Sequence, residues 1–159
     1  MLIRRASPKI ILLASSAVAV THTGDTSETV LATVSIPAGI MGLNGALRIN
    51  SLWSTPGGSG NNKTCRTRLG GISGTQILAT ANTTQLSLGD IGRLFQNRAS
   101  ASSQIMRNPG TFASGGSSAA MSTASVNTAI AQDLVFTAQL ASAGESITLE
   151  QYMVELILP

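Results

Sequence analysis

Apolar and polar residues alternate along much of the chain, and this period of two predicts β-strands rather than helices. Thr29–Ile36 (TVLATVSI) and Ala46–Ser54 (ALRINSLWS) are two clear examples. Between them, Pro37 ends the first run because proline cannot donate to a strand ladder, and Asn44-Gly45 is a strong turn pair. The apolar faces of these two strands carry Val30, Ala32, Val34 and Ile36, followed by Leu47, Ile49 and Trp53.

Three later runs are also predicted to be strands. In Lys63–Leu69 (KTCRTRL), a slip of one residue would bury two arginines, so the register of this strand is well specified. Leu134–Leu140 (LVFTAQL) alternates in the same way, whereas Ser146–Leu158 (SITLEQYMVELIL) ends apolar on both faces, which is typical of a central strand. The residues of this C-terminal region that we expect in the core are Leu134, Phe136, Leu140, Leu149 and Val154.

The rest of the chain is less regular. Thr75–Ala81 and Ser103–Arg107 are predicted to be strands, and Thr111–Thr123 a loop rich in Gly, Ser and Ala. Residues 82–100 (NTTQLSLGDIGRLFQNRAS) fit either short strands or one weak helical turn. A series of short strands separated by Gly, Pro and Asn predicts an all-β chain, an antiparallel β-sandwich or barrel whose connections suit a jelly roll. Helix should account for less than about 15% of the residues.

The N-terminal segment MLIRRASPKIILLASSAVAV has basic residues before an apolar stretch, as a secretory signal does. However, Pro8 and Lys9 separate the basic part from the apolar part, and two serines divide the apolar part, so we do not interpret it as a signal. The same interruptions make it too short for a membrane span. We predict an extended N-terminal arm over residues 1–16, followed by a single β-sandwich domain over residues 17–159.

The predicted arm combines a basic tip with an apolar stem. Arg4 and Arg5 would be costly to bury in the apolar interior of the chain's own sandwich. Ile10, Ile11 and Leu12 are apolar enough to need cover, and an extended segment can add a strand to the edge of a partner's sheet. We therefore predict that these five residues dock on a neighbouring protein. The alternative is that the apolar stem is the first strand of the sandwich itself.

Composition favours an assembly part over a binder of nucleic acid. The 159 residues suit one domain, and only 11% of them are charged. Small polar residues take the place of the missing charges, and they lose little side-chain entropy when they are buried in broad, flat contacts. The net charge is +3, but the basic residues are scattered and lack interleaved aromatic side chains, so nucleic-acid binding is not indicated.

Candidate catalytic or metal-binding residues are few. His22 is the only histidine, and although Asp25 follows it closely, no G-x-S-x-G motif presents a nucleophilic serine; we expect a histidine in a turn between strands. Cys65 is the only cysteine, which excludes an internal disulfide and suggests a small buried side chain. Glu150 and Glu155 fall on opposite faces of a regular strand, unlike a glycosidase pair. We expect no enzymatic activity, no metal and no cofactor.

Several stretches together carry a resemblance to a known group of proteins. These are AVAVTHTGDTSETVLATVSIPAGIMGLNGALRI, LWS, NNKTCRTRLGG, NRAS with the later SQI, and the closing ITLEQYMVEL. With them the chain resembles, from about Ala17 onward, the small β-sandwich proteins and modules of tailed-bacteriophage virions. The resemblance implies a jelly-roll structural domain of a head decoration, head fibre or tail fibre protein.

This resemblance sets the functional expectations. The first is a capsid decoration (cement) protein that binds and stabilises the shell of the major capsid protein, on the virion surface, after synthesis in the host cytoplasm. The second is a head-fibre or tail-fibre module that binds a receptor. The third, from another class, is a secreted carbohydrate-binding or adhesin module. By analogy with such virion modules we expect a homo-oligomer, with a trimer favoured.

Overall fold

The computed structural model describes residues 7–56, 60–84, 86–110 and 121–159, and within them every regular element is a strand. The all-β prediction is therefore confirmed. The strands are β1 (Lys9–Ser16), β2 (Val20–Thr23), β3 (Thr29–Ile36), β4 (Ala46–Ser54), β5 (Lys63–Leu69), β6 (Thr75–Asn82), β7 (Ser87–Asn97), β8 (Gln104–Arg107), β9 (Met121–Ala124), β10 (Gln132–Leu140) and β11 (Ser146–Leu158).

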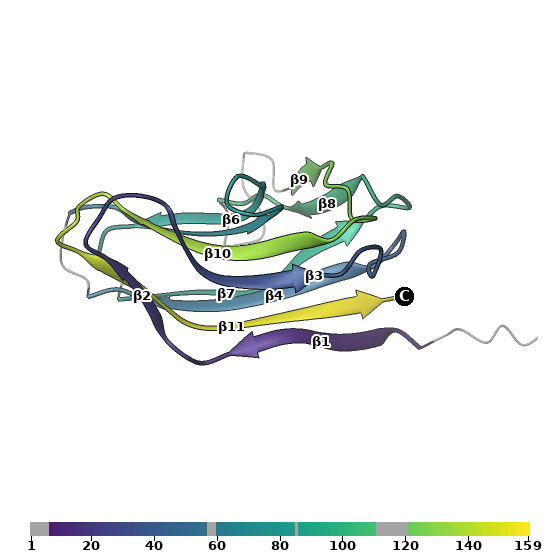
Figure 1. Cartoon of the computed structure of the whole chain (residues 1–159), viewed down its shortest axis with the longest axis horizontal. Coiled ribbons are helices and arrows are strands. Elements are labelled where there is room, and N and C mark those ends of the chain that lie inside the picture. Colours follow the sequence, from purple (N-terminus) through teal and green to yellow (C-terminus); the bar gives the residue numbers. More distant parts are fainter. Residues whose placement is uncertain (1–6, 57–59, 85, 111–120) are drawn as a thin grey trace, which may run out of the picture.

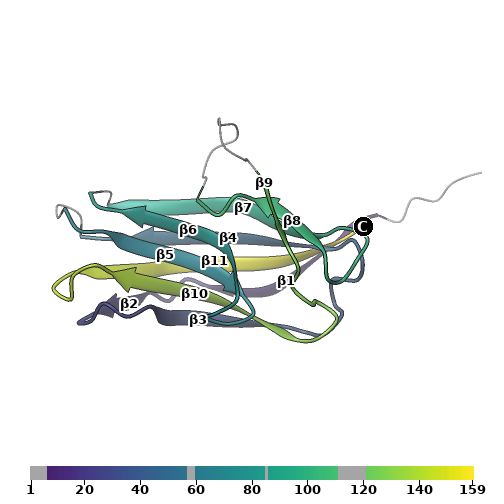
Figure 2. The same ribbon diagram turned by 90° about the horizontal axis from the view of Figure 1, so that it is seen from above.

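The strands form two antiparallel sheets that pack face to face (Figure 1, Figure 2). The larger sheet has the order β1-β11-β4-β7-β8-β9, and β2 pairs with β11 on the same side as β1. The smaller sheet has the order β3-β10-β5-β6. β8 and β9 extend the larger sheet. Without them, and with β1 and β2 counted as one position beside β11, each sheet is four strands wide, and the chain crosses repeatedly between the two sheets. This is the arrangement of a jelly roll.

The core between the sheets is mainly aliphatic, because the chain has few aromatic side chains to fill it. Phe136 from the smaller sheet stacks on Tyr152 from the larger sheet, with ring centroids 4.8 Å apart. The five predicted core residues are confirmed, since none is more than 2% exposed. They are Leu134, Phe136, Leu140, Leu149 and Val154.

Strand bounds predicted from alternation agree with the structure for β3, β4, β5 and β11, but one face assignment is wrong. Val30 was expected on the apolar face of β3 and is 37% exposed, while Leu31 packs against the core. The cause is a shift of register where β3 pairs with β10, between Phe136 and Thr137. A bulge of this kind exchanges the two faces of a strand beyond it.

Two irregular segments are more ordered than the sequence indicated. Residues 82–100 contain β7, an eleven-residue strand, in place of short strands or a helical turn. Its alternation is hidden because polar as well as apolar side chains point inward. Within the predicted loop Thr111–Thr123, residues 121–123 belong to β9, and the remainder lies outside the described residues.

The predicted arm over residues 1–16 must be corrected for its second half. Lys9–Ser16 form β1, which pairs antiparallel with β11 from Lys9 opposite Leu158 to Ser16 opposite Tyr152. Joining the chain's own sheet satisfies the main-chain hydrogen bonds of this segment and lets Ile11 pack against the core. Of the two interpretations of the apolar stem, the first strand of the sandwich is the one that the structure has.

Lys63, at the start of β5, closes one end of the sandwich. Its side chain is fully buried, and its Nζ donates hydrogen bonds to the carbonyl oxygens of Asn61 and Thr83, at 3.1 and 3.2 Å. Glu145 Oε1 lies 3.5 Å from the same nitrogen. A buried ammonium is tolerated only when it is paired and hydrogen-bonded in this way. The contacts tie together three connections that are far apart in sequence.

Phe136→Ala should destabilise the domain strongly. The ring is fully buried and stacks on Tyr152, so its removal loses apolar burial and leaves a cavity between the sheets. We expect a loss of about 3–5 kcal/mol in the free energy of unfolding, measured by urea denaturation. Ile72→Ala, at a residue 43% exposed, is the control and should have little effect. An unchanged urea midpoint for Phe136→Ala would contradict the assignment of Phe136 to the core.

Candidate contact surface on the larger sheet

The two side chains that most often carry chemistry, those of the single histidine and the single cysteine, are buried in this fold. His22 lies in β2, not in a turn as expected, and is 4% exposed with its Nε2 3.8 Å from Asp25 Oδ1. The Cys65 thiol is fully buried, and this burial raises its pKa to about 12. Among the described residues no group of three or more His, Cys, Asp or Glu could hold a metal ion, and no helix there is long and apolar enough to cross a membrane.

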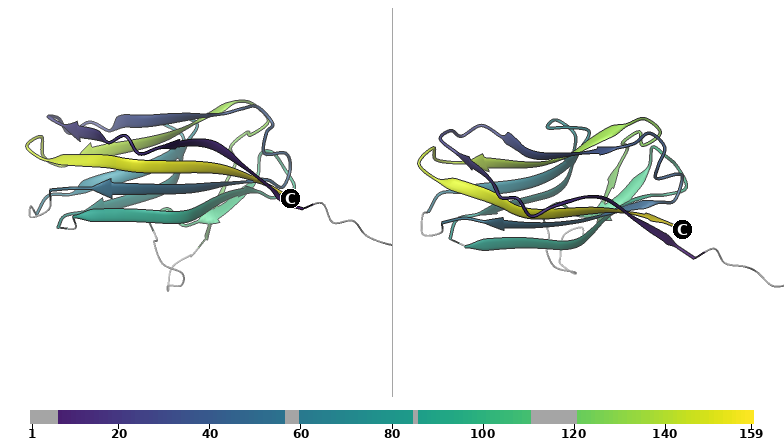
Figure 3. Two further views of the ribbon diagram at one scale, coloured as in Figure 1. Left: turned by 90° about the horizontal axis from the view of Figure 1, so that it is seen from below. Right: turned by 60° about the horizontal axis from the view of Figure 1, so that its bottom comes forward.

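The outer face of the larger sheet is the feature that stands out. Four neighbouring strands, β1, β11, β4 and β7, lie side by side there (Figure 3). Successive partners across them are Leu12, Glu155, Arg48 and Leu94. We call these four residues the central row. Leu12 is 56% exposed and Leu94 is 44% exposed, so two apolar side chains flank a charged pair on an open surface.

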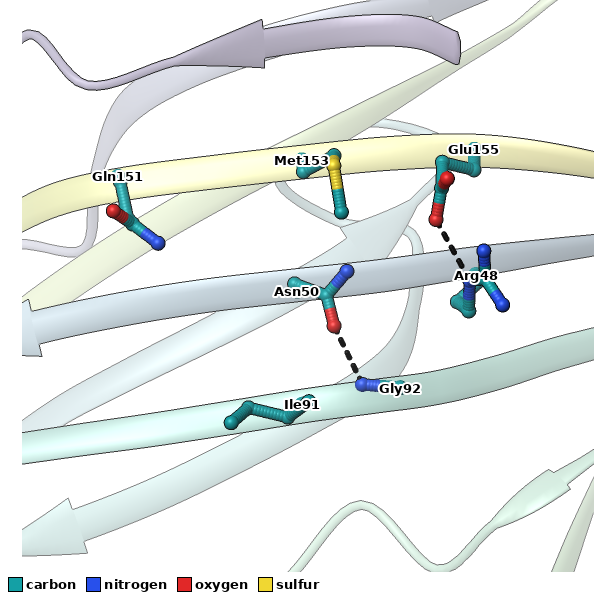
Figure 4. Close-up of a pocket in the computed structure, with 7 residues that line it drawn as sticks. All are labelled: Arg48, Asn50, Ile91, Gly92, Gln151, Met153 and Glu155. Atoms are coloured by element: carbon teal, nitrogen blue, oxygen red, sulfur yellow. Dashed lines mark hydrogen bonds and ion pairs between the residues drawn. The ribbon is translucent and has the colours of Figure 1, made fainter. Parts of the chain in front are cut away.

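The charged pair of the central row is formed within the sheet. Arg48 Nε donates a hydrogen bond to Glu155 Oε2 at 2.7 Å (Figure 4). This bond and the positive charge of Arg48 lower the pKa of the Glu155 carboxyl. The same bond and the negative charge of Glu155 raise the pKa of the Arg48 guanidinium. Both groups are therefore ionised at neutral pH, and their charges cancel at the centre of the face.

Beside the pair runs a shallow groove, whose shape depends on a bulge in β7. The register between β4 and β7 shifts opposite Asn50, where Ile91 and Gly92 occupy the space of one residue. Gly92 has φ +67°, a conformation that favours glycine, and its N–H donates to Asn50 Oδ1 at 2.6 Å. Ile91 is pushed outward and is 84% exposed. The groove is lined by Arg48, Asn50, Ile91, Gly92, Gln151, Met153 and Glu155 (Figure 4).

Two buried charges hold this bulge in place from below. In a regular strand Asp90 and Arg93, three residues apart, would point to opposite faces, but the bulge turns both side chains inward. Arg93 is fully buried and donates to Asp90 Oδ2 at 2.5 Å. Arg93 Nη1 also donates to the carbonyl oxygens of Ile77 and Asn108, each at 3.2 Å. The exposed isoleucine therefore sits on a segment that is fixed to its neighbours.

The outer face of the smaller sheet has a different character. There Arg68 donates to both carboxylate oxygens of Glu28, and Thr137 donates to one of them at 2.6 Å. Arg66 Nη1 lies 3.2 Å from the same carboxylate. Burial opposes ionisation of Glu28, but the hydrogen bonds from Arg68 and Thr137 and the charges of both arginines prevail and lower its pKa. Polar groups on this face are occupied by one another, which leaves the larger sheet as the stronger candidate for contacts.

The residues predicted to dock are divided by the structure. Ile10 is 54% exposed and, with Leu12, points to the outer face of the larger sheet, whereas Ile11 turns toward the core. Arg4 and Arg5 lie outside the described residues. Two of the five predicted residues therefore belong to the candidate surface, as part of β1 and not of a free arm.

Sequence reasoning missed the rest of this surface. Neither the alignment of Arg48 with Glu155 nor that of Leu94 with Arg48 can be read from one strand alone, because it depends on pairing between strands. One signal was present: Gly92 lies inside a strand-like run, and an isolated glycine there suggests a bulge.

Comparison with known proteins gives no family. No protein-family model matches the chain, and no curated protein matches it in sequence. Solved structures with a similar fold include dimeric latent PorU from Porphyromonas gingivalis, with a TM-score of 0.44 and 11% identity over 95% of this chain and 13% of that one. Another is the CBM2 module of the evolved Dit of Lactobacillus casei BL23 phage J-1, with a TM-score of 0.39 and 12% identity over 80% and 69%.

A third is the infectious bursal disease virus VP2 subviral particle, with a TM-score of 0.33 and 12% identity over 96% of this chain and 41% of that one. This chain thus spans less than half the length of the matched PorU and VP2 chains. At such low identities and TM-scores the likeness assigns no function to the chain.

Asp90→Ala should destabilise the domain, because it leaves the buried Arg93 guanidinium without its carboxylate. Breaking a buried pair from one side costs about 3–5 kcal/mol, and we expect a loss of this size in the free energy of unfolding. Asp133→Ala in β10, at an exposed aspartate, is the matched control and should change stability by less than about 0.5 kcal/mol. Equal urea midpoints for the two variants would contradict the role of Asp90.

The Arg48–Glu155 pair should make stability depend on pH in the acid range. Because the pKa of Glu155 is lower in the folded state, the pair stabilises the fold above the ordinary value of 4.5. That contribution is lost as the pH falls through the lowered folded pKa. Glu155→Gln should reduce the acid-induced fall in melting temperature, and Arg48→Gln should reduce it similarly. An acid profile that is identical in all three proteins would rule out a contribution from the pair.

Proposed function

We propose that the protein is a non-enzymatic structural component of a virion, a capsid decoration protein that binds and stabilises the shell of the major capsid protein. One observation carries the assembly role: the outer face of the larger sheet presents apolar side chains around a neutralised charge pair on a rigid, strand-paired frame. Exposed apolar side chains that gather on one rigid face are typical of contact sites between proteins, whereas single exposed apolar side chains are common on any surface.

The setting in a phage particle is supported by the sequence stretches described above and not by a catalytic or binding motif. The buried ionisable side chains are engaged in structural roles: Lys63 closes one end of the sandwich, and Asp90 and Arg93 fix β7. His22 and Cys65 are buried as well, so neither presents its side chain at the surface. A particle component that must persist through assembly needs a stable frame more than it needs chemistry.

A receptor-binding fibre module is the second candidate. The groove in Figure 4 supports it, because Arg48, Asn50 and Gln151 bring hydrogen-bonding groups together on an open face. Against it, none of the described residues that line the groove is aromatic, although flat aromatic surfaces supply much of the contact energy at recognition sites. Decoration of a shell is therefore the preferred role.

Copy number distinguishes these two roles. In purified particles a decoration protein should be present in hundreds of copies, at a fixed ratio to the major shell protein, and a fibre module in a handful. Quantitative mass spectrometry of particles measures the ratio. A chain that is absent from purified particles would overturn the proposed function altogether.

Deleting residues 1–7 tests the docking role predicted for Arg4 and Arg5. The deletion ends before β1, so the melting temperature of the isolated domain should stay nearly unchanged. Binding to empty shells, measured by cosedimentation, should weaken, because the basic tip is lost. The matched variant Arg4→Ala/Arg5→Ala keeps the chain length and should weaken binding as well. Full shell binding by both variants would remove these two arginines from the contact.

A further inference from the structure

We propose that the outer face of the larger sheet pairs with the same face of a second copy of this chain, around a twofold axis that runs along the strands between β11 and β4. This inference rests on the proposed assembly function and names the occupant of the candidate surface. It comes from the order of side chains in the central row, which crosses four adjacent strands in register.

The order of side chains in the central row is complementary to its own reverse, as such an axis requires. Read across the sheet, it is apolar, acidic, basic and apolar: Leu12, Glu155, Arg48 and Leu94. A twofold axis at its midpoint places each strand over the strand at the mirrored position in the other copy, since an isologous contact joins residue i to j and j to i. The row then meets its own reverse. Both leucines find an apolar partner, and each charge faces an opposite charge.

The charged centre favours this arrangement over one in which Arg48 faces Arg48 and Glu155 faces Glu155. Arg48 of one copy lies over Glu155 of the second, and the reverse contact follows by symmetry. The intrachain hydrogen bond at 2.7 Å remains, so each carboxylate is shared between two guanidinium groups and no charge loses its partner on association. The row carries no net charge, so the contact itself adds no charge repulsion between the two copies.

The flanking side chains extend the same match. Next to the central row, Ser15, Met153 and Asn50 follow one another across β1, β11 and β4, and the bulge on β7 presents Ile91. Under the same axis, β7 of one copy lies over β1 of the other, so the outward Ile91 meets the small Ser15. A large side chain facing a small one is the complementarity expected of packed sheets.

The geometry allows a cross-linking test that depends on the position of the axis. Facing sheets lie about 10 Å apart, beyond the reach of a disulfide, so a bifunctional thiol reagent about 10 Å long is suitable. Leu12 and Leu94 of different copies should face each other. Leu12 and its own symmetry copy should be offset by about three strand spacings, or roughly 14 Å, in addition to the gap between the sheets.

Single-cysteine variants Leu12→Cys and Leu94→Cys are therefore prepared separately and mixed. Only the mixture should give a cross-linked dimer in high yield, and each variant alone should give little. The native Cys65 is fully buried and does not interfere. A mixture of Leu12→Cys and Ile72→Cys is the control, because Ile72 has a similar exposure to Leu94 but lies in a loop after β5. Equal yields in all mixtures, or strong cross-linking of Leu12→Cys alone, would overturn the proposed axis.

Sedimentation equilibrium provides the second measurement. The full chain should sediment as a dimer at micromolar concentration, Leu94→Lys as a monomer, and Ile72→Lys as a dimer. Circular dichroism should show that all three are folded, and only Leu94→Lys should lose the part of the melting temperature that comes from association. This dimer replaces the trimer that was favoured by analogy with virion modules, and a monomeric or trimeric wild-type protein would overturn the pairing. Copy number in purified particles is measured independently: a monomer that decorates particles refutes the face pairing alone, whereas a dimer that is absent from particles refutes the proposed function alone.

Discussion

The position of β11 between three other strands is the constraint on which the rest of the sandwich depends. One side of β11 pairs first with β2 and then with β1, and the other side pairs with β4 along most of its length. The same strand supplies buried residues such as Val154 and outward residues such as Glu155. Because side chains alternate, its register fixes the core and the contact surface at once, and neither can shift without the other.

The bulge in β7 is a second feature that links the buried side chains to those on the contact surface. A polar pair, Asp90 and Arg93, is buried where apolar residues are usual, and an isoleucine between them is exposed. This inversion of the usual pattern is satisfied on the inside by hydrogen bonds to carbonyl groups of neighbouring segments. On the outside it leaves an apolar side chain uncovered on a rigid backbone. Such a side chain loses little entropy on contact, which is favourable in an interface anchor.

Much of the fold could be predicted from alternation alone, because one face of most strands is apolar. Leu134 and Phe136 were assigned to the core correctly, since β10 has no break in its inward face. Prediction failed at Val30, where a bulge changes which side chains of the strand face the core. It also failed in β7, where buried charged residues hide the alternation of apolar and polar positions. The N-terminal stem was ambiguous because an apolar strand looks the same whether it pairs with its own sheet or with a partner's.

The candidate surface was less predictable than the fold. Exposed Leu12 could be identified from the sequence as apolar and in need of cover, but its place in a row with Arg48 depends on pairings between distant strands. Spatial rows across a sheet are a property of register, and single-sequence patterns carry register only within each strand. The face of the smaller sheet illustrates the same limit, since Glu28 and Arg68 meet only through strand order.

The pairing of Lys9 with Leu158 has a consequence for the time course of folding. A contact between residues so far apart in sequence closes a very large loop, and sheets built from distant strands form slowly for this reason. During synthesis β1 and β2 emerge early and must wait for β11, while the edge of β4 also lacks its neighbour. Unpaired strand edges of nascent chains invite pairing with other chains. Residues 10–21 carry no charged side chain, so that interval is the period when the protein most needs protection from aggregation.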